Sequence, residues 1–197
     1  MSATLWILLA VGLALVFWAV GAYNRLVRLK NAIANAFGQI DVQLKRRYDL
    51  IPNLVEVARK YLAHEAQTLE AVIAARNQAR SAEQSAAASP LNAGALGALA
   101  GAEQLLGGAL GRLFAVAEAY PDLKADQTMR ELSEELSSTE NRIGFARQAY
   151  NDHVLEFNDA AAQFPTLIVA RLFNFPTQSM LESTSNETER QAVKVAF

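Results

Sequence analysis

The sequence predicts an all-α fold: a long antiparallel up-down-up-down four-helix bundle whose first helix is continuous with an N-terminal transmembrane helix. Three observations predict it. No charge occurs from Leu5 to Ala22, and every Lys and Arg comes later. Beyond that segment, apolar residues recur at intervals of three and four rather than two, which is the helical period. Charged residues make up only 19% of the chain, against about 25% in a typical soluble protein, so some apolar surface is expected to face something other than water.

The apolar segment, "LWILLAVGLALVFWAVGA", has the length of a membrane span, because at about 1.5 Å per residue it just crosses a hydrocarbon core of about 30 Å. A cleaved signal peptide is the competing interpretation. It is disfavoured because no Lys or Arg precedes the segment, whereas Arg25, Arg28 and Lys30 follow it at once. These charges predict that the downstream chain stays in the cytoplasm and that a very short N-terminus lies outside.

Four long helices are expected. The first is continuous with the span, and the other three follow it. The first runs without a break to about Tyr48, and Pro52 begins the second, since a missing N–H costs nothing in a first helical turn. The stretch from Ser89 to Gly111 is mostly Ala, Gly and Leu with Glu103 as its only charge, and it is predicted to be a long loop.

The third helix is predicted to end at Pro121, and the fourth to run from an N-cap at Asp126 to about Gln163. The fourth has the clearest apolar stripe in the chain, with steps of three and four throughout, which is typical of a coiled-coil-like bundle helix. The stripe consists of Met129, Leu132, Leu136, Thr139, Ile143, Ala146, Tyr150, His153, Phe157, Ala160 and Phe164.

Three consecutive basic residues, Lys45, Arg46 and Arg47, lie between Asp41 and Asp49. If the first helix is unbroken, they lie roughly 35 Å from the bilayer surface, well beyond the Debye length of about 8 Å, so they are not expected to hold lipid. We expect the five residues to act together at a membrane-distal corner of the bundle.

At that corner, Lys45 is expected to pair with Asp41 at i,i+4, while Arg46 and Arg47 meet acidic residues of the next turn. Those acidic residues are Asp122, Asp126 and Glu131. Nucleic-acid binding is not expected, because the net charge is −2 and no aromatic residues interleave with the basic ones.

No catalytic, cofactor-binding or metal-binding constellation is predicted. The chain has no Cys, and His64 and His153 lack the spacing of a metal site. The glycines from Gly94 to Gly111 match neither a P-loop nor a dinucleotide-binding fingerprint. The acidic residues Glu131, Glu134, Glu135 and Glu140 are expected on a solvated helix face. We therefore expect no enzyme, no cofactor and no small-molecule substrate.

Five strings resemble the LemA family of bacterial membrane proteins and occur in the family's order: "YNRLVRLKNAI", "QIDVQLKRRYDLIPNLVEVARKYLAHE", "YPDLKADQ", "ELSSTENRIGFARQAYNDHVLEFN" and "FPTLIVARLFNF". They cover Tyr23 to Phe175. The resemblance implies an N-terminal membrane helix on an antiparallel helical bundle, with no established enzymatic activity; one branch of the family is linked to membrane remodelling.

The expected organisation is an anchor at residues 1–22, a LemA-like bundle at 23–175 and a polar tail at 176–197. The expected function is that of a bacterial inner-membrane, single-pass scaffold or assembly protein whose partners are the bilayer and other copies of itself. The alternative is a single-pass signalling protein whose cytoplasmic bundle docks a regulatory partner.

Residues 164–175, "FPTLIVARLFNF", are mostly apolar with the single charge Arg171. A helix that starts at the distal corner and runs roughly 55 Å should bring this segment back to the membrane surface. It is expected either to bury itself at the headgroup boundary, to cap the open end of the bundle, or to fill a contact between subunits.

Overall fold

The computed structural model describes residues 3–181, and these contain helices without any strand. The predicted all-α class is therefore confirmed. The helices are α1 (Ala3–Arg59), α2 (Ala66–Ala88), α3 (Ala93–Ala117), α4 (Pro121–Ala125), α5 (Gln127–Ala162) and α6 (Thr166–Leu172).

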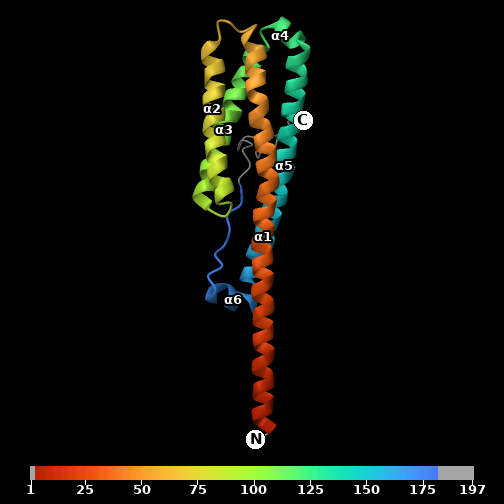
Figure 1. Cartoon of the computed structure of the whole chain (residues 1–197), viewed down its shortest axis with the longest axis vertical. Coiled ribbons are helices and arrows are strands. Elements are labelled where there is room, and N and C mark those ends of the chain that lie inside the picture. Colours follow the sequence, from red (N-terminus) through yellow and green to blue (C-terminus); the bar gives the residue numbers. More distant parts are fainter. Residues whose placement is uncertain (1–2, 182–197) are drawn as a thin grey trace, which may run out of the picture.

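The long helix α1 forms the axis of the molecule, as Figure 1 shows. Its C-terminal part packs against α5 and α2, and α2 packs against α3, whereas its N-terminal part projects alone. The part of the chain from residue 23 to residue 181 is called the helical body below. Its distal end carries the turn between α1 and α2, and its proximal end carries α6, beside the apolar segment.

The first helix does not end near Tyr48, and Pro52 does not begin a new one. Instead α1 continues through Pro52 to Arg59, and the turn lies at residues 60–65. Proline cannot donate to the carbonyl four residues earlier, which leaves the Tyr48 carbonyl without its helical partner. Arg76 of α2 supplies the missing donor, because its Nε lies 3.0 Å from the Tyr48 oxygen. A side chain from another helix thus satisfies the interrupted hydrogen-bond ladder.

The predicted loop from Ser89 to Gly111 is also wrong, because most of it forms α3. Asn92 caps this helix: its side-chain oxygen accepts a hydrogen bond from the Ala95 N–H at 3.0 Å. Each glycine in a helix costs roughly 1 kcal/mol relative to alanine. Burial offsets this cost, since α3 packs a stripe of apolar side chains against the other helices. The stripe comprises Leu96, Leu99, Leu106, Leu110 and Leu113.

The predicted N-cap of α5 is confirmed, since Asp126 Oδ1 accepts a hydrogen bond from the Met129 N–H at 2.9 Å. Most of the predicted stripe is buried, but Val154 is buried in place of His153. Phe164 is 82% exposed because α5 ends at Ala162, so the chain leaves the helical path before reaching it.

The two longest helices match in length within the helical body. From Ala22 to Arg59, α1 rises about 55 Å, and the 36 residues of α5 span about 54 Å. Phe37 of α1 meets Tyr150 of α5 with ring centroids 6.2 Å apart in the core between them. The chain that follows α5 therefore comes back to the level at which the apolar segment of α1 ends.

Candidate functional site

The three basic residues lie well inside the helical body rather than at its distal corner. The corner prediction is wrong because α1 continues beyond them to Arg59. Lys45 and Arg46 are exposed, whereas Arg47 is buried, which follows from the rotation of about 100° per residue around a helix. The three side chains therefore contact different helices.

Lys45 pairs with Asp41 as predicted, with Nζ 2.6 Å from Oδ2. Behind this pair lies Glu83 of α2, whose side chain is 1% exposed and whose Oε1 lies 3.6 Å from Lys45 Nζ. Asp41 Oδ1 and Glu83 Oε1 are buried oxygens that accept no hydrogen bond from an N–H of the described residues, since Lys45 Nζ is too far from Glu83 Oε1 to donate one. A proton held between the two carboxyl groups would satisfy both oxygens.

The electrostatics of this pair agree with a shared proton. Burial, together with the adjacent Asp41 carboxylate, raises the pKa of Glu83 to about 7. Burial alone would raise the pKa of Asp41 as well, but hydrogen bonds from Glu83 and Lys45 outweigh it and lower that pKa. While Glu83 holds its proton, it is therefore the donor and Asp41 the acceptor.

Arg46 and Arg47 do not meet the acidic residues expected for them. Arg46 pairs at the surface with Glu135 of α5, with Nε 3.0 Å from Oε1. Arg47 Nη1 lies 2.6 Å from Glu103 Oε2 and 3.1 Å from Glu140 Oε2. Glu135 and Glu140 thus pair with α1 while their side chains stay 42% and 46% exposed, and Glu131 and Glu134 are exposed as predicted.

Glu103 is a buried carboxylate held on both sides by α1. Tyr48 donates its hydroxyl to Glu103 Oε1 at 2.5 Å, while Arg47 binds the other oxygen. Burial raises the pKa of Glu103, and the Arg47 charge and the Tyr48 hydroxyl oppose that rise. Burial, followed by the nearby Glu103 charge, also raises the pKa of Tyr48, so Tyr48 remains a donor. The only charge of the apolar stretch therefore fixes α3 to α1.

The acidic turn at the distal end has other partners. Asp126 accepts a hydrogen bond from the Tyr61 hydroxyl at 2.9 Å, in addition to capping α5. Its pKa is lowered by the Met129 N–H and then by Tyr61. Asp49 is exposed and has no hydrogen bond or ion pair among residues 3–181.

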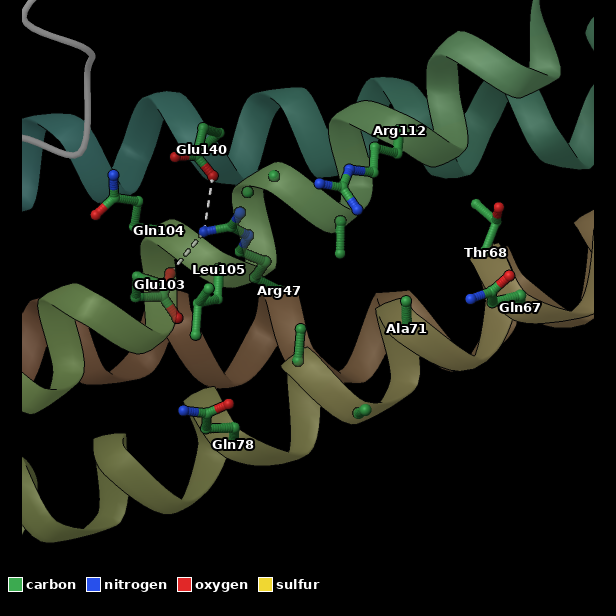
Figure 2. Close-up of a pocket in the computed structure, with 15 residues that line it drawn as sticks. Arg47, Gln67, Thr68, Ala71, Gln78, Glu103, Gln104, Leu105, Arg112 and Glu140 are labelled. Carbon is green, nitrogen blue, oxygen red and sulfur yellow. Dashed lines mark hydrogen bonds and ion pairs between the residues drawn. The ribbon is translucent and has the colours of Figure 1, made fainter.

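A cleft of about 1180 Å³ opens between α2 and α3, with Arg47 at its base. Figure 2 shows the Arg47 guanidinium between Glu103 and Glu140, and Arg112 farther along α3. Small residues on both helices make the cleft wide. They are Ala71, Ala74 and Ala75 on α2 and Gly107, Gly108 and Ala109 on α3. The Arg47 guanidinium in this cleft is already paired with Glu103 and Glu140.

The histidines are apart from this region. His64 lies in the turn between α1 and α2, and His153 Nδ1 is 3.9 Å from Glu156 on the same helix. Within the described range, no group of three or more His, Asp or Glu side chains could hold a metal ion.

A C-terminal segment held against α5 is a feature that sequence reasoning missed. Asn158 accepts a hydrogen bond from the Gln178 N–H at 2.8 Å and donates to the Gln178 carbonyl at 3.0 Å. Asn151 does the same for Leu181, at 2.9 and 3.0 Å. Spaced seven residues apart, the two amides lie on one face of α5 and fix a non-helical segment through its backbone.

At the proximal end, the apolar part of α1 is exposed except at Ala19 and Ala22, where it meets the helical body. One helix among the described residues, α1, is long and apolar enough to cross a membrane, and none of its most apolar 18-residue window is buried. Three aromatic side chains meet at the end of that apolar part. The ring centroid of Tyr23 lies 5.0 Å from that of Phe173 and 5.6 Å from that of Phe175. Residues 164–175 therefore lie beside the end of the apolar segment, as expected from the helix lengths.

An exposed apolar helix that leads into a packed helical body defines a membrane-associated helical protein. The sequence pattern of the LemA family matches residues 36–197, and the chain belongs to that family, which confirms the resemblance drawn from the sequence motifs.

Relatives with which the chain shares sequence carry the name magnetosome protein. The chain is 26% identical over 168 residues to magnetosome protein MamQ of Magnetospirillum gryphiswaldense. The aligned region covers 78% of this chain and 62% of the relative. The chain is 27% identical to magnetosome protein MamQ 2 of Paramagnetospirillum magneticum, with the same coverage. The chain thus matches less than two thirds of the length of these relatives.

Proposed function

We propose that this chain is a single-pass protein of the bacterial inner membrane that acts as a scaffold or assembly module, without catalysis, through helix packing and self-association. The observation that carries the proposal is the continuity of α1. One unbroken helix includes both the exposed apolar segment and the first long helix of the body. Insertion of that segment into a bilayer would therefore hold the body at a fixed place and orientation.

The charges beside the apolar segment support a cytoplasmic body. Arg25, Arg28 and Lys30 are exposed, and no acidic residue occurs in α1 before Asp41. Positive charge next to a span favours the cytoplasmic side. The short N-terminus would then lie outside.

An antiparallel four-helix bundle made of α1, α2, α3 and α5 is the arrangement that the contacts support best. Tyr61 near the end of α1 bonds Asp126 at the start of α5, and Tyr23 contacts the chain just beyond the end of α5. The buried charges join these helices: Arg47 binds Glu103 and Glu140, and their mutual pairing gives them a structural role rather than a reactive one.

Self-association is supported by large apolar side chains that the described part of the chain leaves uncovered on α5. Phe145 is 73% exposed and Leu155 is 48% exposed. Gly12 and Ala19 also offer close helix approach within the span. The magnetosome names of the relatives are consistent with a role in organising a membrane, which we propose for this chain as well.

The alternative is a relay in which the body docks a regulatory partner. Two features favour it: α1 connects the span rigidly to the body, and Glu83, with a pKa of about 7, lies against α1. Scaffold and relay differ in assembly, since a scaffold requires many copies in contact and a relay does not.

The anchor is tested by alkaline carbonate extraction of bacterial membranes. The full chain should remain in the pellet, and a variant lacking residues 1–22 should be largely released. Extraction of the full chain to the same extent as the truncated one would refute a transmembrane anchor.

A further inference from the structure

We propose that α6 and its flanking residues form a second membrane contact, which lies in the headgroup region of the bilayer beside the anchor. This inference rests on the proposed insertion of the apolar segment of α1. The occupant is the lipid surface itself, and the contact is made by the outer face of residues 164–173.

The two faces of this segment are both apolar but differ in what covers them. Val169 and Ala170 are each 3% exposed and pack onto the helical body. The opposite face is uncovered: Phe164 is 82%, Ile168 56% and Leu172 75% exposed. Within α6, the spacing of four residues places Ile168 and Leu172 in one row, and Phe164 is exposed just before the helix begins.

The turn after α6 keeps this row directed away from the body. The Phe175 N–H bonds the Ala170 carbonyl at 2.9 Å, and the intervening Asn174 has φ 54°. This is the Schellman arrangement, in which an asparagine tolerates the left-handed conformation. It brings the Phe175 ring back against Tyr23 and Phe157, so the inner face of the segment is fixed.

The position of the row identifies lipid as its occupant. Tyr23 follows the last residue of the uncharged segment and contacts Phe173 at 5.0 Å. The row is therefore at the level where the span would leave the hydrocarbon, as Figure 1 shows for α6 beside α1. Tyrosine rings are enriched at that depth of a membrane.

Charge around the row fits an anionic lipid surface. Arg171 lies within α6, and Arg25 and Arg28 lie on α1 within two turns of Tyr23. All three are exposed and form no ion pair among residues 3–181. Long basic side chains beside apolar ones are typical of helices that lie in the headgroup plane. The exposed carboxylate nearest to residues 164–173 in the sequence is that of Asp159, about one turn before the end of α5.

The absence of cysteine allows a direct test with single labels on the full chain. Ile168→Cys and Leu172→Cys would each carry an environment-sensitive fluorophore, in protein reconstituted into phosphatidylcholine–phosphatidylglycerol vesicles. Val42→Cys, at a position of α1 in the helical body that is 57% exposed against 56% for Ile168, is the matched control, and Leu13→Cys marks the span. Quenching by nitroxide on the lipid chains is compared with quenching by aqueous iodide.

Labels at 168 and 172 should be quenched by the lipid nitroxide several-fold more than the label at 42, and should be protected from iodide. Lipid quenching equal to that at 42 would overturn the proposal, and so would protection from both quenchers, which would indicate a contact between copies. A label at 13 that escapes lipid quenching would refute the anchor. Quenching at 13 without quenching at 168 and 172 would refute the α6 contact alone.

Discussion

The continuity of α1 through Pro52 depends on a single side chain from α2, and this dependence can be measured. Arg76→Ala removes a charged donor from the Tyr48 carbonyl, which Pro52 cannot replace. A hydrogen bond to a charged group contributes about 1.5–3 kcal/mol, and the carbonyl is left inside the body. For a chain of this length, each kcal/mol shifts the melting temperature by about 2–4 °C, so a decrease of roughly 3–12 °C is expected.

The assay is thermal unfolding of the full chain in detergent, followed by its helical circular dichroism. Arg80→Ala removes an exposed arginine one turn away and is the matched control, with an expected cost within about 0.5 kcal/mol. In a Pro52→Ala background, residue 52 can again donate to the Tyr48 carbonyl. In that background, Arg76→Ala should lower the free energy of unfolding by at least about 1 kcal/mol less than it does in the natural chain. This difference is the coupling energy between the two sites. Equal costs in the two backgrounds would refute the reasoning.

Three further predictions concern the other polar contacts. Glu103→Ala should destabilise the protein by about 1.5–3 kcal/mol, because the buried Arg47 then keeps only Glu140 as a partner and the Tyr48 hydroxyl is left unpaired, whereas Glu135→Ala at the surface should cost under about 1 kcal/mol; equal costs in urea unfolding would contradict this. The raised pKa of Glu83 means that its proton stabilises the fold at low pH and that this contribution is lost as pH rises through about 7. Glu83→Gln retains a donor at every pH, so its stability relative to the natural chain should increase between pH 5 and 8, by at most about 3 kcal/mol; a constant difference would exclude a shared proton. Finally, Asn151→Ala with Asn158→Ala should expose the segment at 176–181 to limited proteolysis while the rest of the chain stays intact, and unchanged cleavage would show that the two amides do not hold it.

Features that depend on local sequence could be predicted. The helical period identified α1, α2 and α5, and the Asp126 cap and the Asp41–Lys45 pair follow from residues three or four apart. Helix length alone placed residues 164–175 beside the end of the apolar segment, and Tyr23 and Phe173 meet there.

Features that depend on distant partners could not be predicted. Pro52 would ordinarily mark a helix start, and its tolerance requires Arg76, which lies on another helix. The glycines of α3 have weak helix propensity, and only burial of the leucines between them overrides it. Glu103 carried a usable signal, since a lone charge in an apolar stretch requires a buried partner, but the sequence does not say that the partner is Arg47.

The central claim, that an anchored helical body assembles into a scaffold, is tested most directly by native mass spectrometry of the full chain released from detergent micelles. The account predicts complexes of several copies that persist on dilution, because Phe145, Leu155 and the small residues of the span provide packing faces. Monomer alone across the whole concentration range would contradict it.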